Sequence, residues 1–216
     1  MVSLFDMQKK HIITLSGKPG GGKSSTSDKV AEMLSYSRYS SGDFVRKIIR
    51  KKGITLTEFN EMAELDHEID HEIDEELRKL RNQRDIVIDS RLGFYWIPES
   101  FKVYLDLDMD VATARIYKDA ISNEGRAYGA GIAGSIAEVK KQVQGRLDGE
   151  TRRFKAMYGV DPYRTSNFDL VINTARHSPQ TVALTVFDTY KKWLKSDEWT
   201  PVHSEVPMGF SYDNRY

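Results

Sequence analysis

Residues 17–24 spell Gly-Lys-Pro-Gly-Gly-Gly-Lys-Ser, between a β-rich apolar run and a segment with helical spacing. Glycines let the backbone turn tightly, so that several amide N–H groups point inward. A helix that starts at the end of such a turn adds the positive end of its dipole. The strand-to-helix context therefore predicts a phosphate-binding loop rather than a glycine-rich turn without a ligand.

The side chains of this loop predict a bound nucleoside triphosphate with Mg²⁺. Lys23 is expected to reach the β- and γ-phosphates, and the Ser24 hydroxyl is expected to ligate Mg²⁺. The pattern indicates a triphosphate and leaves the acceptor open. The expected nucleotide-binding residues are Gly17, Lys18, Pro19, Gly20, Gly21, Gly22, Lys23, Ser24 and Ser25.

Short apolar runs alternate with helical patterns along the rest of the chain. Strands are expected at residues 11–16, 36–40, 86–89, 102–107 and 169–173, and helices at 23–35, 111–122, 135–158 and 179–194. Strands separated by helices need crossover connections, which produce a parallel sheet. The pattern predicts an α/β protein with the P-loop NTPase fold, a five-stranded parallel sheet flanked by helices.

The chain divides into a core and a tail. Residues 1–195 are expected to form the core, with a helical insert at 43–84 and a lid region at about 118–155. Within the insert Thr57 is a candidate N-cap. The glycine-rich residues 125–134 predict a loop, and residues 196–216, which lack a period, are expected to lie outside the core.

The composition narrows the class of function. Lys and Arg number 32, as do Asp and Glu, so the basic excess typical of nucleic-acid binding is missing. There is no cysteine, which excludes disulfides and thiolate chemistry. No run reaches the roughly 20 apolar residues of a membrane span. We therefore expect a cytoplasmic, monomeric protein that acts on small molecules, with no membrane and no nucleic acid as partner.

Two segments that follow expected strands carry candidate acceptor-binding residues. Ser41 and Asp43 precede Arg46, whose guanidinium can hold a phosphate with two hydrogen bonds, although an ordinary capped helix with a surface arginine has the same sequence. Asp89 and Arg91 come at the end of the third strand, where open α/β sheets bind ligands. Asp89 would hold a water of Mg²⁺; the alternative for this pair is a strand-end salt bridge.

A third candidate set lies on the long helix at residues 135–158. Arg146, Glu150 and Arg153 are spaced by four and three residues and share one face. Two arginines beside a carboxylate can hold phosphates, and the carboxylate can accept a hydrogen bond from a sugar hydroxyl. Spacing alone favours the alternative, a solvated helix with i,i+4 ion pairs.

Several motifs together resemble the cytidylate kinases, particularly their short archaeal branch. They are GKPGGGKSS, SSGDFVR, IVIDSRLG, KVYLD, RLDGETRRFKAMYGVD and DLVINT, and the resemblance runs from about residue 11 to about residue 183. It implies transfer of the ATP γ-phosphate to CMP or dCMP with Mg²⁺, on a five-stranded core with a monophosphate-binding insert and an arginine-bearing lid.

The resemblance also implies roles for individual residues. Ser41 would contact the base, Arg46 and Arg153 the acceptor phosphate, Arg91 the base and phosphate, Arg146 and Glu150 the ribose or the transferring phosphate, and Arg115 the phosphates as the lid closes. Asp43 belongs to the same substrate-binding set, and Ser24 and Asp89 form the metal set. Lys23, Arg115, Arg146 and Arg153 are the expected catalytic residues.

Two alternatives remain open at the level of sequence. The acceptor can be another monophosphate, a sugar or an RNA end; a hydroxyl acceptor needs a carboxylate base, for which Asp43 or Asp89 qualifies. The chain can also be a non-catalytic nucleotide-binding module that uses its aromatic tail to hold a partner. That tail contains Trp199, Phe210, Tyr212 and Tyr216.

Overall fold

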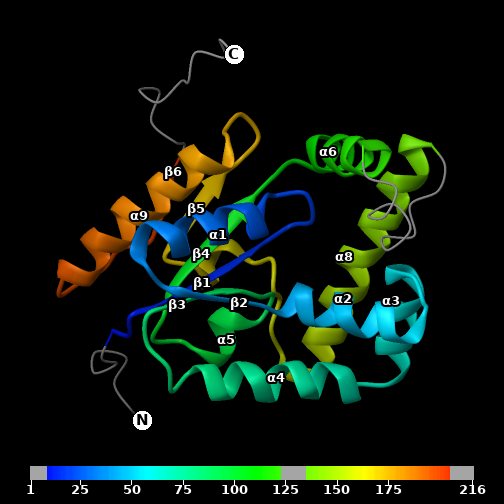
Figure 1. Cartoon of the computed structure of the whole chain (residues 1–216), viewed down its shortest axis with the longest axis horizontal. Helices are drawn as coiled ribbons and strands as arrows, with labels where there is room; N and C mark the ends of the chain where they lie inside the picture. The colour runs from blue at the N-terminus through cyan, green and yellow to red at the C-terminus, as the bar shows by residue number, and fades with distance from the viewer. Residues whose placement is uncertain (1–8, 123–134, 205–216) are drawn as a thin grey trace.

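The computed structural model of the protein, described at residues 9–122 and 135–204, is built on one parallel sheet (Figure 1). The strand order is β2-β3-β1-β4-β5-β6. The strands are β1 (Ile12–Gly17), β2 (Ser37–Ser40), β3 (Ile86–Asp89), β4 (Phe101–Asp106), β5 (Leu170–Asn173) and β6 (Val202–Ser204). Every neighbouring pair is parallel, which confirms the predicted α/β class.

Helices connect the strands and cover both faces of the sheet. They are α1 (Lys23–Leu34), α2 (Ser41–Lys52), α3 (Leu56–Leu65), α4 (Glu68–Leu80), α5 (Gly93–Trp96), α6 (Met109–Ser122), α8 (Ile136–Tyr158) and α9 (Pro179–Lys195). Figure 1 shows α2, α3 and α8 gathered to one side of the sheet, away from α9.

The side chains of the central strand β1 alternate between the two faces of the sheet, and each face has its own hydrophobic core. Ile13 and Leu15 on β1 belong to the cluster that packs under α1 and α9, where Val186 is also fully buried. Ile12 points the other way and packs with Leu77 of α4 and Phe154 of α8. Successive side chains of a strand point to opposite faces. A strand buried on both faces is therefore largely apolar, and in β1 the two buried polar side chains are Thr14, which is hydrogen-bonded to Ser100, and Ser16.

The sheet has six strands rather than the five expected. The difference is minor, but the sixth strand extends the core beyond residue 195, where it was expected to end. Residues 202–204 pair with β5 as β6, with Leu170 opposite Val202. The indole of Trp199 packs on Phe101 with ring centroids 6.2 Å apart, and its Nε1 donates to the Asp169 carbonyl at 3.2 Å. The expectation that the chain leaves the core after residue 195 is thus wrong for residues 199–204.

The insert between β2 and β3 forms three helices with a small core of their own. Ile49, Phe59 and Ala63 pack together from α2 and α3. The turn between these helices uses Gly53 at φ 67°, a conformation that favours glycine. The N-cap of α3 is Thr55, whose side chain forms a capping box with Glu58. Thr57, the expected cap, instead lies inside the first turn.

Helix α8 packs against the insert at α3 and α4 and against α6. Ser135 caps it through a capping box with Glu138, and the helix ends at Gly159 with φ 68°. Val139, Val143 and Leu147 turn one face of α8 toward α6. The loop predicted at residues 125–134 lies outside the described residues.

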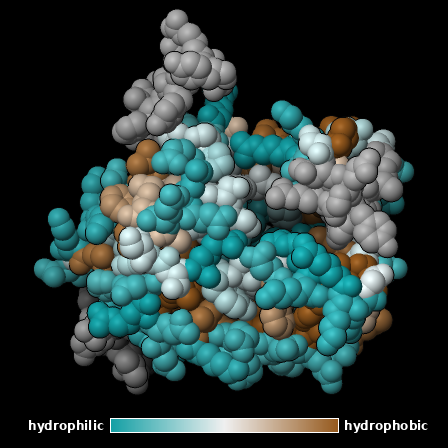
Figure 2. All heavy atoms as spheres, viewed as in Figure 1, coloured by the Kyte–Doolittle hydropathy of each residue, from teal (hydrophilic) through white to brown (hydrophobic). Residues whose placement is uncertain are grey.

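The surface in Figure 2 is mostly hydrophilic, with hydrophobic residues in separate small groups. Among the residues that the structure describes, no helix has the length and apolar character needed to cross a membrane.

Candidate functional site

The loop between β1 and α1 has the backbone that its glycines predict. Gly17 has φ 141°, and a Cβ there would lie 2.3 Å from the Leu105 carbonyl oxygen. Gly20 and Gly22 have φ values of 74° and 81°. These positive angles and the close approach to β4 explain why the loop contains glycine at these three positions.

Lys23 begins α1 and folds its side chain back over this loop. Its Nζ donates to the Gly17 carbonyl at 2.8 Å and to the Lys18 carbonyl at 2.9 Å. Burial, and after it the positive charge of Arg91, lower the pKa of Lys23 well below its ordinary value. An anion beside this ammonium would favour its charged form, so the loop is electrostatically suited to a phosphate.

The Ser24 hydroxyl and the Asp89 carboxylate lie side by side at the end of the sheet. Ser24 Oγ donates to Asp89 Oδ2 at 2.9 Å. Parallel pairing of β1 with β3 places Leu15 opposite Asp89, so β3 ends beside the loop. No group of three or more acidic or histidine side chains in the described part of the chain could hold a metal. Mg²⁺ binds through one or two carboxylates, waters and substrate phosphates, and the Ser24–Asp89 pair fits that pattern.

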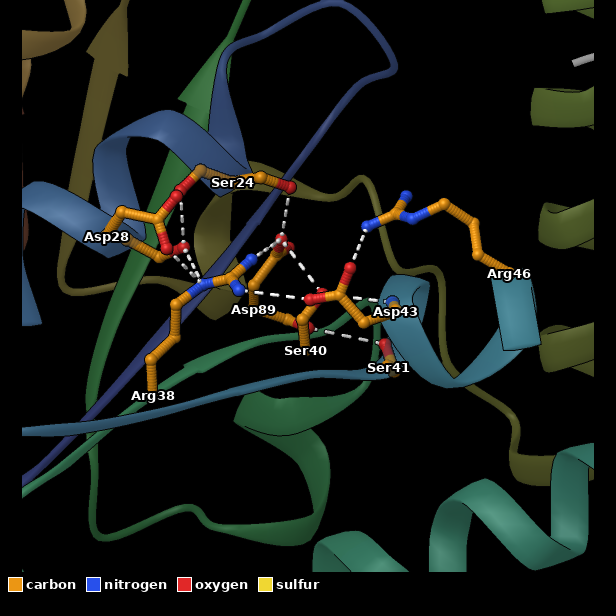
Figure 3. Close-up of polar contacts among 9 residues, drawn as sticks. Ser24, Asp28, Arg38, Ser40, Ser41, Asp43, Arg46 and Asp89 are labelled. Carbon is orange, nitrogen blue, oxygen red and sulfur yellow. Dashed lines mark hydrogen bonds and ion pairs between the residues drawn. The ribbon is translucent and has the colours of Figure 1, made fainter. Parts of the chain in front are cut away.

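Arg38 on β2 lies at the centre of the polar network in Figure 3, which extends from the loop to α2. Its guanidinium contacts Asp28 of α1 at 2.9 Å and Asp43 of α2 at 3.0 Å, and lies 3.7 Å from Asp89 Oδ2. Arg38 was absent from the expected set. The available signal was its place two residues before Ser40, which puts both side chains on one face at the end of a strand.

Helix α2 starts at Ser41, so Ser41 and Asp43 lie in its first turn. The N-cap Ser40 accepts from the Asp43 backbone N–H. Ser41 Oγ donates to the Asp89 carbonyl at 3.3 Å, and Arg46 donates to Asp43 Oδ1 at 2.5 Å. Arg46 is half-exposed at the rim of the site.

Glu150 of α8 is a buried carboxylate between two arginines. Arg91 Nε donates to its Oε2 and Arg146 Nε donates to its Oε1, both at 2.8 Å, and the Tyr163 hydroxyl donates to Oε2. Burial alone would raise the pKa of Glu150, but Arg91 and then Arg146 outweigh it and hold the pKa well below its ordinary value. The alternative of a solvated helix face does not hold here, because Glu150 is 5% exposed. Tyr163 was not anticipated from the sequence.

Arg153 pairs with a different carboxylate from the one its spacing indicates. Its Nε lies 2.7 Å from Asp70 Oδ2 on α4, and both side chains are buried. Burial, opposed by Arg153 and assisted by Asp74, raises the pKa of Asp70 to about 6. Arg153 therefore joins α8 to the insert, whereas Arg146 pairs within α8 with Glu150, the carboxylate that also binds Arg91.

Arg115 of α6 is fixed on the other side of the loop. Its Nη2 donates to the carbonyls of Thr174 at 2.7 Å and Ala175 at 3.0 Å, and its Nη1 to the Gly20 carbonyl at 3.5 Å. A cavity of about 280 Å³ lies here between the loop and the start of α9, beside His177.

A larger cavity of about 890 Å³ brings most of the expected residues together. It extends from the loop to the insert and to α8, and its lining includes residues from each of them. Those relevant to the predictions are Pro19, Gly20, Gly22, Lys23, Ser24, Ser25, Ser41, Asp43, Arg46, Asp89, Arg91, Arg115, Arg146, Glu150 and Arg153. Of the expected set only Gly17, Lys18 and Gly21 do not line it; they lie in the loop beneath.

Sequence similarity to known proteins covers most of the chain. The model of the cytidylate kinase-like family matches residues 12–176. The curated cytidylate kinase of Halobacterium salinarum is 36% identical over 180 residues, which is 82% of this chain and 88% of the relative. That of Thermoplasma volcanium is 32% identical over 195 residues, 88% of this chain and 96% of the relative.

Solved structures support the fold. The shikimate kinase of Bacteroides thetaiotaomicron superposes with a TM-score of 0.56 at 12% identity, covering 86% of this chain and 98% of that one. At this identity the likeness shows a shared fold and carries nothing about the reaction or the acceptor.

Proposed function

Because this chain belongs to the cytidylate kinase-like family, we propose that it transfers the γ-phosphate of ATP to a pyrimidine nucleoside monophosphate, CMP or dCMP, and releases ADP with CDP or dCDP. We also propose that it acts as a monomer on free nucleotides in cytoplasmic pyrimidine metabolism. The observation that carries the proposal is the 890 Å³ cavity, in which the phosphate loop faces arginines from α2, the end of β3 and α8.

The donor side of the reaction is assigned to the loop. Its backbone N–H groups and the Lys23 ammonium would hold the β- and γ-phosphates. Ser24 and Asp89 would hold Mg²⁺, which when bound supplies positive charge to the triphosphate oxygens. The smaller cavity beside Arg115 and His177 is proposed to accept the base of ATP, because it opens off the same loop.

The acceptor side is assigned to the arginines across the cavity. Arg46 and Arg153 would hold the acceptor phosphate, and Arg91 would lie near that phosphate and the base. Arg146 and Glu150 would lie at the ribose or the transferring group, and Ser41 near the base. Ion-paired arginines that are already in place align the two substrates, which is the main requirement of in-line phosphoryl transfer.

Closure completes the proposed mechanism. The insert of α2, α3 and α4 would bind the monophosphate, and the region from about 118 to 155 would act as the lid. Expelling water from the cavity limits transfer of the γ-phosphate to water. The acceptor phosphate oxygen is already a nucleophile, so no general base is assigned.

The contacts of Asp43 favour a phosphate acceptor over a hydroxyl acceptor. One of its oxygens accepts from Arg38 and the other from Arg46. Partial burial would raise the pKa of Asp43, but hydrogen bonds from Arg46 and Arg38 outweigh it and lower the pKa below its ordinary value. Such a carboxylate is a weak base for activating a hydroxyl. Asp89, the other candidate base, is occupied by Ser24.

An acceptor screen with the purified chain tests the proposal. ATP and Mg²⁺ are supplied with CMP, dCMP, UMP, AMP, GMP, shikimate or a 5′-hydroxyl RNA, and ADP release is measured. The highest kcat/KM is expected with CMP or dCMP. ATP binding without turnover of any acceptor would favour the non-catalytic nucleotide-binding module. Turnover of the RNA end or of shikimate in place of CMP would show that the proposed acceptor is wrong.

A further inference from the structure

Arg38 is the one side chain in Figure 3 that contacts residues from α1, from the end of β3 and from α2. Its Nε donates to Ser27 Oγ at 3.0 Å and lies 2.9 Å from Asp28 Oδ1. Its Nη1 donates to Asp43 Oδ2 at 3.0 Å, and its Nη2 lies 3.7 Å from Asp89 Oδ2. Each of its three nitrogens is thus directed to a different element.

The three carboxylates around Arg38 would repel one another without it. Asp28 is mostly exposed, so water screens its charge, whereas the Asp89 side chain is only 8% exposed. A guanidinium offers several donors in a fixed planar fork, which a lysine ammonium on a flexible stem does not reproduce. The geometry of Arg38, and not only its charge, is therefore suited to holding these groups apart at fixed positions.

One branch of this network reaches the donor side. Asp89 Oδ2, next to the Arg38 guanidinium, also accepts from Ser24 Oγ at 2.9 Å and from Ser40 Oγ at 3.4 Å. Arg38 thereby helps to fix the carboxylate that lies beside the loop serine.

The other branch reaches the acceptor side. Asp43 accepts from Arg38 at Oδ2 and from Arg46 at Oδ1, and the Arg46 side chain is half-exposed. Helix α2 starts directly after β2. The strand that carries Arg38 therefore also fixes the start of the helix that carries Arg46.

We propose that Arg38 is a positioning residue that couples the two halves of the site: one guanidinium holds Asp89 beside Ser24 and, through Asp43, orients Arg46. The inference rests on the proposed function, since it assigns Asp89 to the Mg²⁺–ATP side and Arg46 to the acceptor. Arg38 itself touches neither substrate in this scheme.

Two variants test the proposal through binding rather than turnover. Arg38→Lys keeps the charge and loses the fork, and Arg38→Met loses both. Calorimetry measures CMP binding without Mg²⁺, and separately the binding of a non-hydrolysable ATP analogue over a Mg²⁺ titration. We expect both variants to weaken CMP binding about tenfold and to raise the Mg²⁺ concentration needed for analogue binding about tenfold. Arg81→Met is the matched control, because it removes an arginine paired with Glu99 outside the cavity and should change neither quantity.

A double-variant cycle tests the branch through Asp43. If Arg38 acts on Arg46 through that carboxylate, adding Asp43→Asn to Arg38→Met should weaken CMP binding no further than Arg38→Met alone. Asp43→Asn alone should leave the Mg²⁺ dependence of analogue binding unchanged. Fully additive losses in CMP binding would overturn the branch.

The remaining outcomes are also decisive. Wild-type affinities for both ligands in Arg38→Lys would show that charge suffices and overturn the positioning role. Weakening of only one ligand would overturn the coupling. If Arg38→Met does not fold, Arg38→Lys alone decides. If the wild-type chain binds the ATP analogue but not CMP, the proposed acceptor is overturned and not the role of Arg38. In that case the Mg²⁺ dependence of analogue binding decides, and an unchanged dependence in the variants would overturn the role of Arg38.

Discussion

Arg91, at the end of β3, donates to the Glu150 carboxylate of α8 at 2.8 Å across 59 positions of sequence. Glu150 also accepts from Arg146, so one buried carboxylate fixes two arginines on the wall of the cavity. The pair links the sheet to the helix that is proposed to move with the lid.

Lys23→Ala is expected to remove nearly all turnover, because Lys23 is the cation of the phosphate loop and would offset charge on the transferring group. We predict a fall in kcat/KM of more than a hundredfold, about 2.7 kcal/mol. Circular dichroism should show an unchanged fold. A loss of only about tenfold would be incompatible with this role.

Arg46→Ala offers the cleanest test of the acceptor side, since Arg46 is half-exposed and its pair with Asp43 contributes only about 0–1 kcal/mol to stability. We expect kcat/KM for CMP to fall more than a hundredfold, while the Kd of an ATP analogue stays within about threefold. Arg152→Ala is the control: this arginine is also exposed, pairs with Glu64 and does not line the cavity. Equal losses for ATP and CMP would move Arg46 to the donor side.

Ala variants of Arg91 and Arg153 are expected to lose stability as well as activity. Arg153→Ala leaves the buried Asp70 without its arginine, and Arg91→Ala leaves the buried Glu150 with Arg146 as its remaining arginine. Breaking a buried pair in this way costs about 3–5 kcal/mol. Urea unfolding measures the loss, and stability within about 1 kcal/mol of wild type would show that water reaches these carboxylates.

Glu150→Gln is expected to lower the free energy of unfolding at neutral pH by about 3–5 kcal/mol, because Arg91 and Arg146 lose their shared anion. The pKa of Glu150 is depressed in the folded state, so its stabilising contribution is complete above the unfolded pKa of about 4.3 and is lost as the pH falls toward the folded pKa. The difference between wild type and variant should thus be constant from about pH 6 to 8 and shrink below about pH 5. Urea unfolding across this range checks the sign, and a difference that widens on acidification contradicts it.

Trp199→Ala tests whether the segment after α9 belongs to the core. Trp199 packs on Phe101 and donates to the Asp169 carbonyl. Losing this partly buried ring should lower the free energy of unfolding by about 1–3 kcal/mol. Val202→Ala, at an exposed position of β6, should change it by less than about 0.5 kcal/mol. A neutral Trp199→Ala would mean that this packing adds nothing to stability.

Local patterns determined much of this protein from the sequence alone. The glycines of residues 17–22, followed by Lys23 and Ser24, fix a phosphate loop because backbone conformation and helix dipole act within a few residues. The apolar runs identify β1, β3, β4 and β5, because a strand buried on both faces is largely apolar. Crossover helices then require a parallel sheet, and its carboxyl edge places Asp89 near the loop.

Tertiary structure alone decided which charges meet. The spacing of Arg146, Glu150 and Arg153 indicates one shared face, yet Arg153 pairs with Asp70 on α4. Arg38 gathers carboxylates from three elements, and β6 pairs through only three residues. Such contacts join distant segments and leave no period in the sequence, because their energy comes from burial and from partners that only the packed sheet and helices bring within reach.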